Sequence, residues 1–210
     1  MEIKNLHYIT TTAQAAELAC QGGVRWVQLR VKNLPAAEWQ KRALDVQAVC
    51  QRHGATLIIN DNPKLALAMG ADGVHLGKQD MAPAEARALL GPQFIIGGTA
   101  NTFADIEGLV AAGVDYIGLG PLRFTTTKEK LSPILGLAGY ADILGQCRAA
   151  GFTTPIVAIG GVALADIPAL LATGLHGVAV SGAIGNAADP AAAAAHFAAE
   201  LAKNHLVASV

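Results

Sequence analysis

Eight short apolar runs alternate with longer segments rich in Ala and Leu along this chain, and this alternation restricts its fold more than any other feature. The runs cover residues 6–10, 24–30, 56–60, 73–76, 94–97, 116–120, 155–160 and 177–180. Continuous apolar runs are typical of parallel strands, because helices cover both faces of a parallel sheet. A strand followed by a helix, repeated eight times, predicts the α/β class and a single (β/α)8 barrel, the TIM barrel.

The segments between the runs have the composition and the endings of helices. They cover residues 13–21, 36–52, 63–69, 83–90, 103–112, 137–149, 163–172 and 190–203. Glycine directly or closely follows most of them, at the position where a helix commonly ends in a left-handed conformation. These expected stop residues are Gly22, Gly54, Gly70, Gly91, Gly113, Gly151 and Gly174.

Length and composition favour one domain with small-molecule partners. Eight strand–helix units need nearly all of the 210 residues, so we expect one domain over residues 1–210. The chain is 52% hydrophobic but has no apolar run near the ~20 residues of a membrane span, which argues against a membrane partner. A net charge of −1 without a basic stripe argues against nucleic acid. Residues 1–5 show no targeting leader, so we expect a cytoplasmic location, and a homo-oligomer stays open.

An alternating polar pattern follows the second run. Gln28, Arg30 and Lys32 are spaced two apart and therefore share one side of an extended chain. If that side faces the mouth of the barrel, an amide and two cations form an anion site, and the planar guanidinium suits phosphate oxygens. The alternative is an exposed strand edge with solvated charges, which a closed barrel does not have.

Two carboxylates follow the next two runs. Asn60 and Asp61 end the third run, and Asp80 lies four residues beyond the fourth. Adjacent strand ends bring such residues to one rim, and two carboxylates completed by water and substrate phosphate suit one Mg²⁺ ion. The alternative is that each Asp caps a helix, since Pro63 and Pro83 follow them.

Hydroxyl and glycine residues follow the later runs. Thr125, Thr127 and Lys128 lie in a loop after the sixth run, which offers hydroxyls and a cation; a solvated turn is the alternative. Pairs at 160–161 and 181–182 occupy the places where barrels of this class often bind phosphate through backbone N–H groups. Turn formation alone is the alternative for these pairs. Arg123 fits either phosphate or water, and His75 reads best as a hydrogen-bonded interior residue.

Together these features predict two anion-binding pockets at one mouth. One is a cationic pocket suited to a diphosphate, and the other is an uncharged backbone pocket suited to a monophosphate. No paired nucleophile and base stands out in the sequence. The pattern favours catalysis by charge stabilisation of a leaving group.

The residues that form this pattern resemble the thiamine-phosphate synthase family, also called thiamine-phosphate pyrophosphorylase. The resemblance extends over almost the whole chain, and six segments occur in the family's order. These segments are QLRVK at 28–32, IND at 59–61, ADGVHLG at 71–77 with Asp80, GP through TTTK at 120–128, AIGG at 158–161 and GVAVS at 177–181.

The resemblance implies an alkyl transferase of thiamine biosynthesis. Such an enzyme couples 4-amino-2-methyl-5-hydroxymethylpyrimidine diphosphate to a thiazole monophosphate and releases thiamine phosphate and pyrophosphate. It implies that the diphosphate is held by Arg30, Lys32, Asn60 and Lys128, with Gln28 orienting the pyrimidine. It implies Mg²⁺ at Asp61 and Asp80. It places the thiazole phosphate at Thr125, Thr127, Gly161, Val180, Ser181 and Gly182.

Thr99 stands where the family usually has Ser, and the resemblance implies that it contacts the pyrimidine or the departing pyrophosphate. Arg30, Lys32 and Lys128 would act with it on the leaving group. The chain departs from the family at Asn62, often Arg, at Asn101, often His, and at Gly182, often Ser. None of these departures removes a charged residue of the expected site.

Three other functions fit parts of the pattern. A related thiazole tautomerase shares the barrel and the monophosphate site, but Asn101 replaces the histidine associated with that chemistry. A non-catalytic phosphate-ligand sensor would have no use for two carboxylates suited to Mg²⁺. An isomerase of a sugar phosphate would need a carboxylate or thiol base that the sequence does not place.

Overall fold

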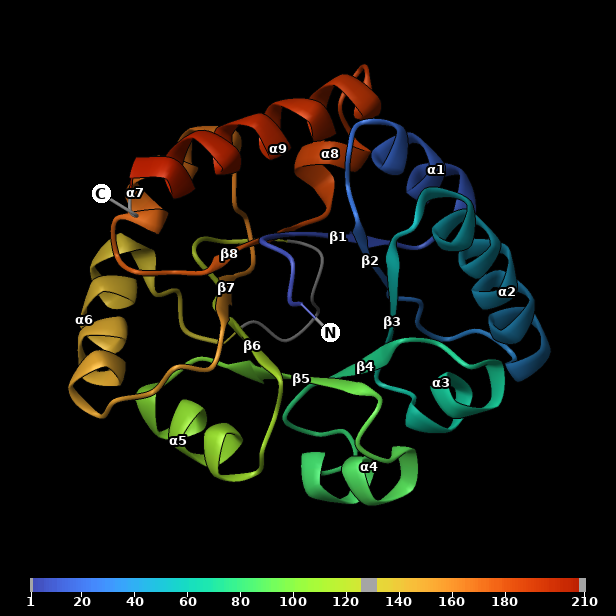
Figure 1. Cartoon of the computed structure of the whole chain (residues 1–210), viewed down its shortest axis with the longest axis horizontal. Helices are drawn as coiled ribbons and strands as arrows, with labels where there is room; N and C mark the ends of the chain where they lie inside the picture. The colour runs from blue at the N-terminus through green and yellow to red at the C-terminus, as the bar shows by residue number, and fades with distance from the viewer. Residues whose placement is uncertain (1, 126–131, 208–210) are drawn as a thin grey trace.

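The computed structural model describes residues 2–125 and 132–207, and it confirms the predicted fold class. Eight parallel strands pair in sequence order, and β1 pairs with both β2 and β8, so that the sheet closes into a barrel. Figure 1 shows the strands in the centre and the helices in a ring around them. The strands are β1 (Leu6–Thr10), β2 (Trp26–Leu29), β3 (Thr56–Asn60), β4 (Gly73–Leu76), β5 (Ile95–Ala100), β6 (Tyr116–Leu119), β7 (Ile156–Ala158) and β8 (Gly177–Val180).

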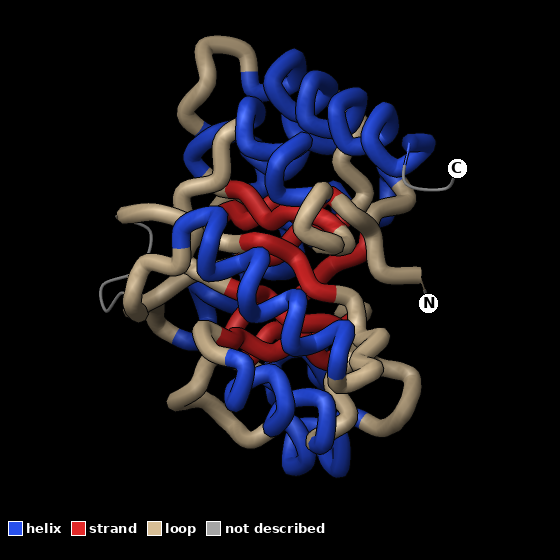
Figure 2. Tube along the Cα trace, turned by 90° about the vertical axis from the view of Figure 1, so that its left-hand side faces the viewer, coloured by secondary structure: helices blue, strands red, loops and turns tan. Residues whose placement is uncertain are grey.

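Helices follow the strands and cover the outside of the barrel, as Figure 2 shows from the side. They are α1 (Ala13–Gln21), α2 (Ala36–His53), α3 (Pro63–Met69), α4 (Pro83–Leu90), α5 (Phe103–Ala111), α6 (Gly136–Ala149), the 3-10 turn η1 (Leu164–Asp166), α7 (Ile167–Leu171), α8 (Gly182–Gly185) and α9 (Pro190–Val207). Among the described residues, no helix combines the length and the apolar character needed to cross a membrane. That residues 1–210 form one domain remains our proposal.

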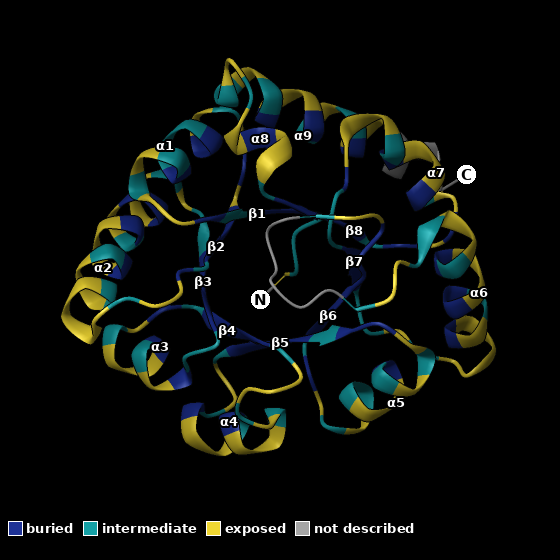
Figure 3. Ribbon diagram, turned by 180° about the vertical axis from the view of Figure 1, so that it is seen from behind, coloured by how far each residue is buried: buried dark blue, intermediate teal, exposed yellow. Residues whose placement is uncertain are grey.

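The strands are buried on both faces, which explains their continuous apolar sequences. Inside the barrel, side chains from different strands form one small cluster: Trp26, Ile58, Ile95, Tyr116, Val157 and Ala179. A larger cluster fills the space between the barrel and the helices, with residues such as Val27, Leu57 and Val74 facing outward. Figure 3 shows that the exposed residues lie mainly on the outer faces of the helices and in the loops.

Several predicted boundaries were wrong. Strand β5 extends to Ala100, which places Thr99 within a strand, whereas β2 ends at Leu29. The segment 163–172 divides into η1 and α7, because proline lacks an N–H group and favours the first turn of a helix, and Pro168 lies in the first turn of α7. The short helix α8 was not predicted.

The glycine after α1 is the clearest correction among the helix stops. Gly22 has a φ of −77°, and the left-handed residue is Gly23, with a φ of 98°. A Cβ atom at Gly22 would lie 2.2 Å from the carbonyl oxygen of Ala191, so this glycine is needed for the close approach of α9. The glycines after α2 and α3, Gly54 and Gly70, are left-handed as predicted.

Candidate functional site

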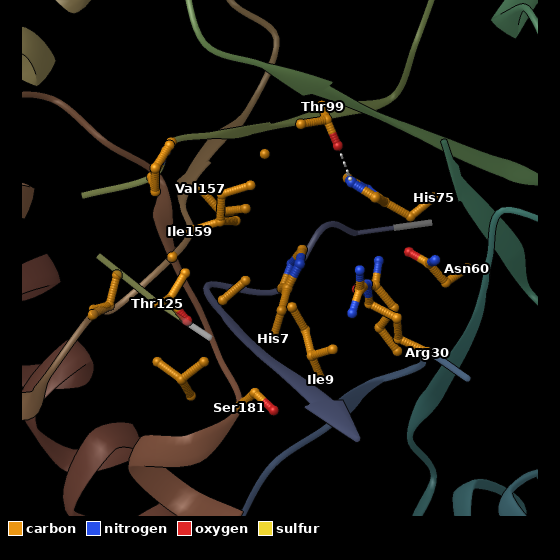
Figure 4. Close-up of a pocket in the computed structure, with 18 of the residues that line it drawn as sticks. His7, Ile9, Arg30, Asn60, His75, Thr99, Thr125, Val157, Ile159 and Ser181 are labelled. Atoms are coloured by element: carbon orange, nitrogen blue, oxygen red, sulfur yellow. Dashed lines mark hydrogen bonds between the residues drawn. The ribbon is translucent and has the colours of Figure 1, made fainter. Parts of the chain in front are cut away.

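A cavity of about 810 Å³ opens at the carboxyl ends of the strands and is lined by every predicted site residue that the structure describes. Figure 4 shows Arg30 and Asn60 on one side of it, Ser181 and Thr125 on another, and His7 and Ile9 between them. The predicted lining residues are Gln28, Arg30, Lys32, Asn60, Asp61, Asp80, Thr99, Thr125, Gly161, Val180, Ser181 and Gly182. Thr127 and Lys128 lie outside the described residues.

The cationic side of the cavity begins where β2 ends. The backbone N–H of Arg30 donates to the carbonyl oxygen of Thr10 at 2.9 Å, which continues the pairing with β1. Leu29 and Val31 are buried in the core, whereas Gln28, Arg30 and Lys32 line the cavity. The predicted alternation is therefore present, and the exposed-edge alternative is wrong, because β2 lies between β1 and β3 in the closed barrel.

The acidic pair lies beside these cations. Asp61 follows β3 with a φ of 63°, and its N–H donates to the carbonyl oxygen of His75 at 2.8 Å. Asp80 is held by its own turn, where its Oδ2 accepts from the Gly77 N–H at 2.7 Å. Burial is the main cause that raises the pKa of Asp61 to about 6, the contact with the Asp80 carboxylate adds to the increase, and Lys32 opposes it.

Neither carboxylate caps a helix, so that alternative is wrong. The N-cap of α3 is Asn62, whose Oδ1 accepts from the Leu65 N–H at 2.9 Å. The N-cap of α4 is Ala82, which has no side chain able to cap. Asn62, at a position where the family often has Arg, therefore caps α3, and Asp61 lines the cavity.

The two carboxylates suit a Mg²⁺ ion that takes its other ligands from water and substrate. Within residues 2–125 and 132–207 no group of three or more His, Cys, Asp or Glu side chains is placed to hold a metal. Burial first, and then the neighbouring Asp80 carboxylate, raise the pKa of Asp61, and a divalent cation between the two carboxylates would favour their charged forms.

The opposite side of the cavity is lined by uncharged residues that follow β7 and β8. Gly160 and Gly161 follow β7 with φ values of 80° and 76°, and Ser181 and Gly182 follow β8 at the start of α8. Arg123 is not part of the lining. Its guanidinium donates to both carboxylate oxygens of Asp166, at 2.6 and 2.7 Å, and to the carbonyl oxygen of Gly161 at 2.8 Å. Arg123 therefore holds the segment that follows β7 through Gly161 and Asp166, and it does so from outside the cavity lining.

The cavity is also lined by two rings that the sequence analysis did not place there, those of His7 and Tyr116. His7 stacks on Trp26 with ring centroids 4.3 Å apart, and Tyr116 meets both rings edge-on. Burial lowers the pKa of His7 to about 3, so this ring is neutral at physiological pH. Period-two alternation along 6–10 could have identified His7 and Ile9 as inward-facing. Lys78, also missed, lines the rim and donates to Asp105 at 2.5 Å.

His75 lies in the interior, as predicted. Its side chain is buried, its Nδ1 is 3.0 Å from the Tyr116 hydroxyl, and its Nε2 is 2.9 Å from Thr99 Oγ1. The same ring also lines the cavity, so it is an interior residue that reaches the site.

Asn101 joins the ends of the loop that follows β6. Its buried Nδ2 donates to the carbonyl oxygens of Gly120 and Pro133, both at 2.9 Å. The N–H of Leu135 also donates to the carbonyl oxygen of Pro121 at 3.0 Å, so both ends of the loop are held together. The departure from the family at position 101 thus has a structural role.

We expect Asn101→Ala to lower the free energy of unfolding by about 1–3 kcal/mol, because the carbonyl groups of the buried Gly120 and of the exposed Pro133 lose their shared donor. Chemical denaturation measures the change. The control is Gln146→Ala, which removes an exposed contact within α6 and should change the value by less than about 0.5 kcal/mol. Equal effects of the two substitutions would contradict the role assigned to Asn101.

Comparison with known proteins agrees with this geometry. The sequence pattern of the family described as thiamine monophosphate synthase matches residues 4–184. The chain belongs to the thiamine monophosphate synthase family. A thiamine-phosphate synthase from Phocaeicola vulgatus is 50% identical over 195 residues, which cover 91% of this chain and 94% of that protein. One from Bacteroides fragilis is 52% identical over 177 residues, 84% of this chain and 87% of that protein.

A solved structure supports both the family and the fold. The thiamine phosphate pyrophosphorylase from Pyrococcus furiosus superposes with a TM-score of 0.84 at 27% identity, over 95% of this chain and 96% of that one. The family resemblance predicted from the sequence motifs is therefore confirmed.

Proposed function

We propose that this chain couples 4-amino-2-methyl-5-hydroxymethylpyrimidine diphosphate to a thiazole monophosphate, forming thiamine phosphate and pyrophosphate. The observation that supports this proposal best is the division of one cavity into a side with Arg30, Lys32 and two carboxylates and an uncharged side lined by the residues that follow β7 and β8, Gly160, Gly161, Ser181 and Gly182. Membership of the thiamine monophosphate synthase family supports it independently.

In the proposed reaction the bond between the pyrimidine methylene carbon and the diphosphate oxygen breaks, and its electron pair leaves with pyrophosphate. The lone pair of the thiazole nitrogen then forms the new C–N bond. No proton has to be removed from that nitrogen, which agrees with a site built around charged and hydrogen-bonding groups. Arg30, Lys32 and Lys128 neutralise the departing charge, and Asn60 and Gln28 orient the diphosphate and the pyrimidine.

Asp61 and Asp80 would hold one Mg²⁺ ion, which would neutralise charge on the leaving pyrophosphate. Thr125, Thr127, Gly161 and the backbone around Ser181 would hold the thiazole phosphate. Small molecules are the partners that this site requires, and the expected cytoplasmic location and possible homo-oligomer remain predictions.

Pyrophosphate release by the purified protein, with each component omitted in turn, tests this function. Release that requires the pyrimidine diphosphate, the thiazole phosphate and Mg²⁺ together, with an equal amount of thiamine phosphate, supports the synthase. Tight thiazole-phosphate binding without release would instead favour a tautomerase or a sensor.

We expect Arg30→Ala and Lys128→Ala each to lower kcat/KM by at least about 100-fold, because each would remove a positive charge that the proposed reaction uses to stabilise the leaving group. Lys41→Ala is the control, since Lys41 is exposed on α2 and pairs only with Asp45 among the ion pairs described for it. Thermal unfolding should be nearly unchanged for Lys128→Ala. Wild-type turnover in the Arg30→Ala or the Lys128→Ala variant would remove that residue from the mechanism.

A further inference from the structure

Hydrogen-bonding side chains from four strands form a connected chain beneath the cavity. Gln28 from β2 contacts the Tyr116 hydroxyl from β6, which lies 3.0 Å from His75 Nδ1 on β4. His75 Nε2 lies 2.9 Å from Thr99 Oγ1 on β5, the bond drawn as a dashed line in Figure 4. Thr99 and His75 both line the cavity, so the chain ends at the site.

The packing of the barrel holds these rings in place. A Cβ atom at Gly97 would lie 2.2 Å from Cζ of Tyr116, and one at Gly118 would lie 3.3 Å from Cε1 of His75. Both glycines therefore leave room for the rings. Trp26 packs edge-on against Tyr116 from the other side, with ring centroids 5.4 Å apart. These contacts hold the ring of Tyr116 with its hydroxyl 3.0 Å from His75 Nδ1.

The direction of each hydrogen bond follows from the donors available. A phenol O–H is a stronger donor than a neutral imidazole N–H, and the phenol oxygen can at the same time accept an amide N–H from Gln28. Tyr116 then donates its only hydrogen to His75 Nδ1. A neutral imidazole that accepts at Nδ1 carries its hydrogen on Nε2, which donates to Thr99 Oγ1.

We propose that this chain of hydrogen bonds turns the hydroxyl hydrogen of Thr99 into the cavity and makes Thr99 a fixed donor to the pyrimidine diphosphate, with Gln28, Tyr116 and His75 as positioning residues. Its partner is an acceptor atom, either a diphosphate oxygen or a pyrimidine ring nitrogen. The inference about the ligand rests on the proposed function, whereas the arrangement of the protein groups does not.

The tautomer of His75 tests the arrangement in the protein without ligand. Long-range ¹H–¹⁵N NMR on histidine-labelled protein distinguishes the two neutral tautomers, and the signal lost in His75→Gln identifies His75 among the six histidines. We expect hydrogen on Nε2, and we expect Tyr116→Phe to shift the ring toward a mixture of tautomers. Hydrogen on Nδ1 in the wild type would overturn the proposal.

A double-substitution cycle tests the link to catalysis. Thr99→Val removes the donor at nearly constant shape and should lower kcat/KM by about 10- to 100-fold, whereas Thr99→Ser should retain most activity. Tyr116→Phe should cause a smaller loss in the wild type and almost none on top of Thr99→Val, since it acts through Thr99. Additive losses would show that Tyr116 acts by another route, and the proposal would be wrong.

Binding of two probes locates the acceptor. If Thr99→Val weakens the binding of inorganic pyrophosphate, the acceptor is a phosphate oxygen. If it weakens the binding of the unphosphorylated pyrimidine alcohol, the acceptor is a ring nitrogen. Unchanged binding of both probes would overturn the proposal. A wild-type protein that shows the Nε2 tautomer but releases no pyrophosphate would contradict the proposed function and leave the protein arrangement standing.

Discussion

The double variant Asp61→Asn, Asp80→Asn should lose pyrophosphate release by at least about 100-fold and should no longer respond to Mg²⁺. The two carboxylates are in contact at the rim of the cavity, beside Arg30 and Lys32, and asparagine keeps their shape without their charge. Asparagine also tolerates the left-handed backbone at position 61, where φ is 63°. A loss of activity in this variant therefore reports the missing charge rather than a distorted turn.

The same substitutions should make the protein more stable in buffer without Mg²⁺. Burial and Asp80 raise the pKa of Asp61 to about 6 from an ordinary value of 3.8, so the folded protein binds more protons than the unfolded chain between these values. Stability contributed by this group therefore falls as pH rises through that window, and the cost persists above pH 6. Neutral asparagine removes the cost, so the unfolding midpoint at pH 7.5 should rise.

Thermal unfolding at pH 7.5 and at a pH well below 3.8, together with Mg²⁺ titrations of activity, measures both effects. The gain in midpoint should vanish at a pH well below 3.8, the ordinary pKa, where the wild-type carboxyl is protonated in both states. Asp45→Asn on the surface of α2 is the control, since Asp45 is exposed and remote from the cavity lining. A variant that keeps its Mg²⁺ response would refute the metal assignment.

Gly177→Ala should prevent stable folding. Gly177 begins β8, and an added Cβ would lie 2.0 Å from the carbonyl oxygen of Asn5. That carbonyl cannot move away freely, because it accepts the Val178 N–H at 2.8 Å where β8 meets β1 and closes the barrel. We expect a loss of at least about 3 kcal/mol, a large part of the stability of a typical domain.

Soluble yield and denaturant midpoint measure this loss, and Gly108→Ala provides the matched control. Gly108 lies within α5, and apart from its chain neighbours and the backbone of its own helix no atom of the described residues lies within 4 Å of a Cβ built there. Alanine favours a helix over glycine, so the control should be neutral or more stable by up to about 1 kcal/mol. A Gly177→Ala protein with a wild-type midpoint would contradict this prediction. It would show that β1 and β8 can move apart enough to accept the added Cβ atom.

The sequence by itself determined the barrel and most of one side of the site. Strands buried on both faces need continuous apolar runs, and the helices that cover them need periodic apolar positions. The type and order of the elements can therefore be predicted from short stretches of sequence. The alternation from Gln28 to Lys32 is also local, because neighbouring residues of an extended chain point in opposite directions. The ends of the strands could be located for the same reason, to within a few residues.

Only the tertiary structure decided which distant side chains meet. Capping by Asp61 was as good a local interpretation as metal binding until Asn62 proved to cap α3. Thr99, His75 and Tyr116 come together because β4, β5 and β6 pair in a particular register, and no residue near any of them in sequence carries that information. Sequence periodicity reports which face of an element is buried, whereas the partner on that face is chosen by the closure and packing of the whole barrel.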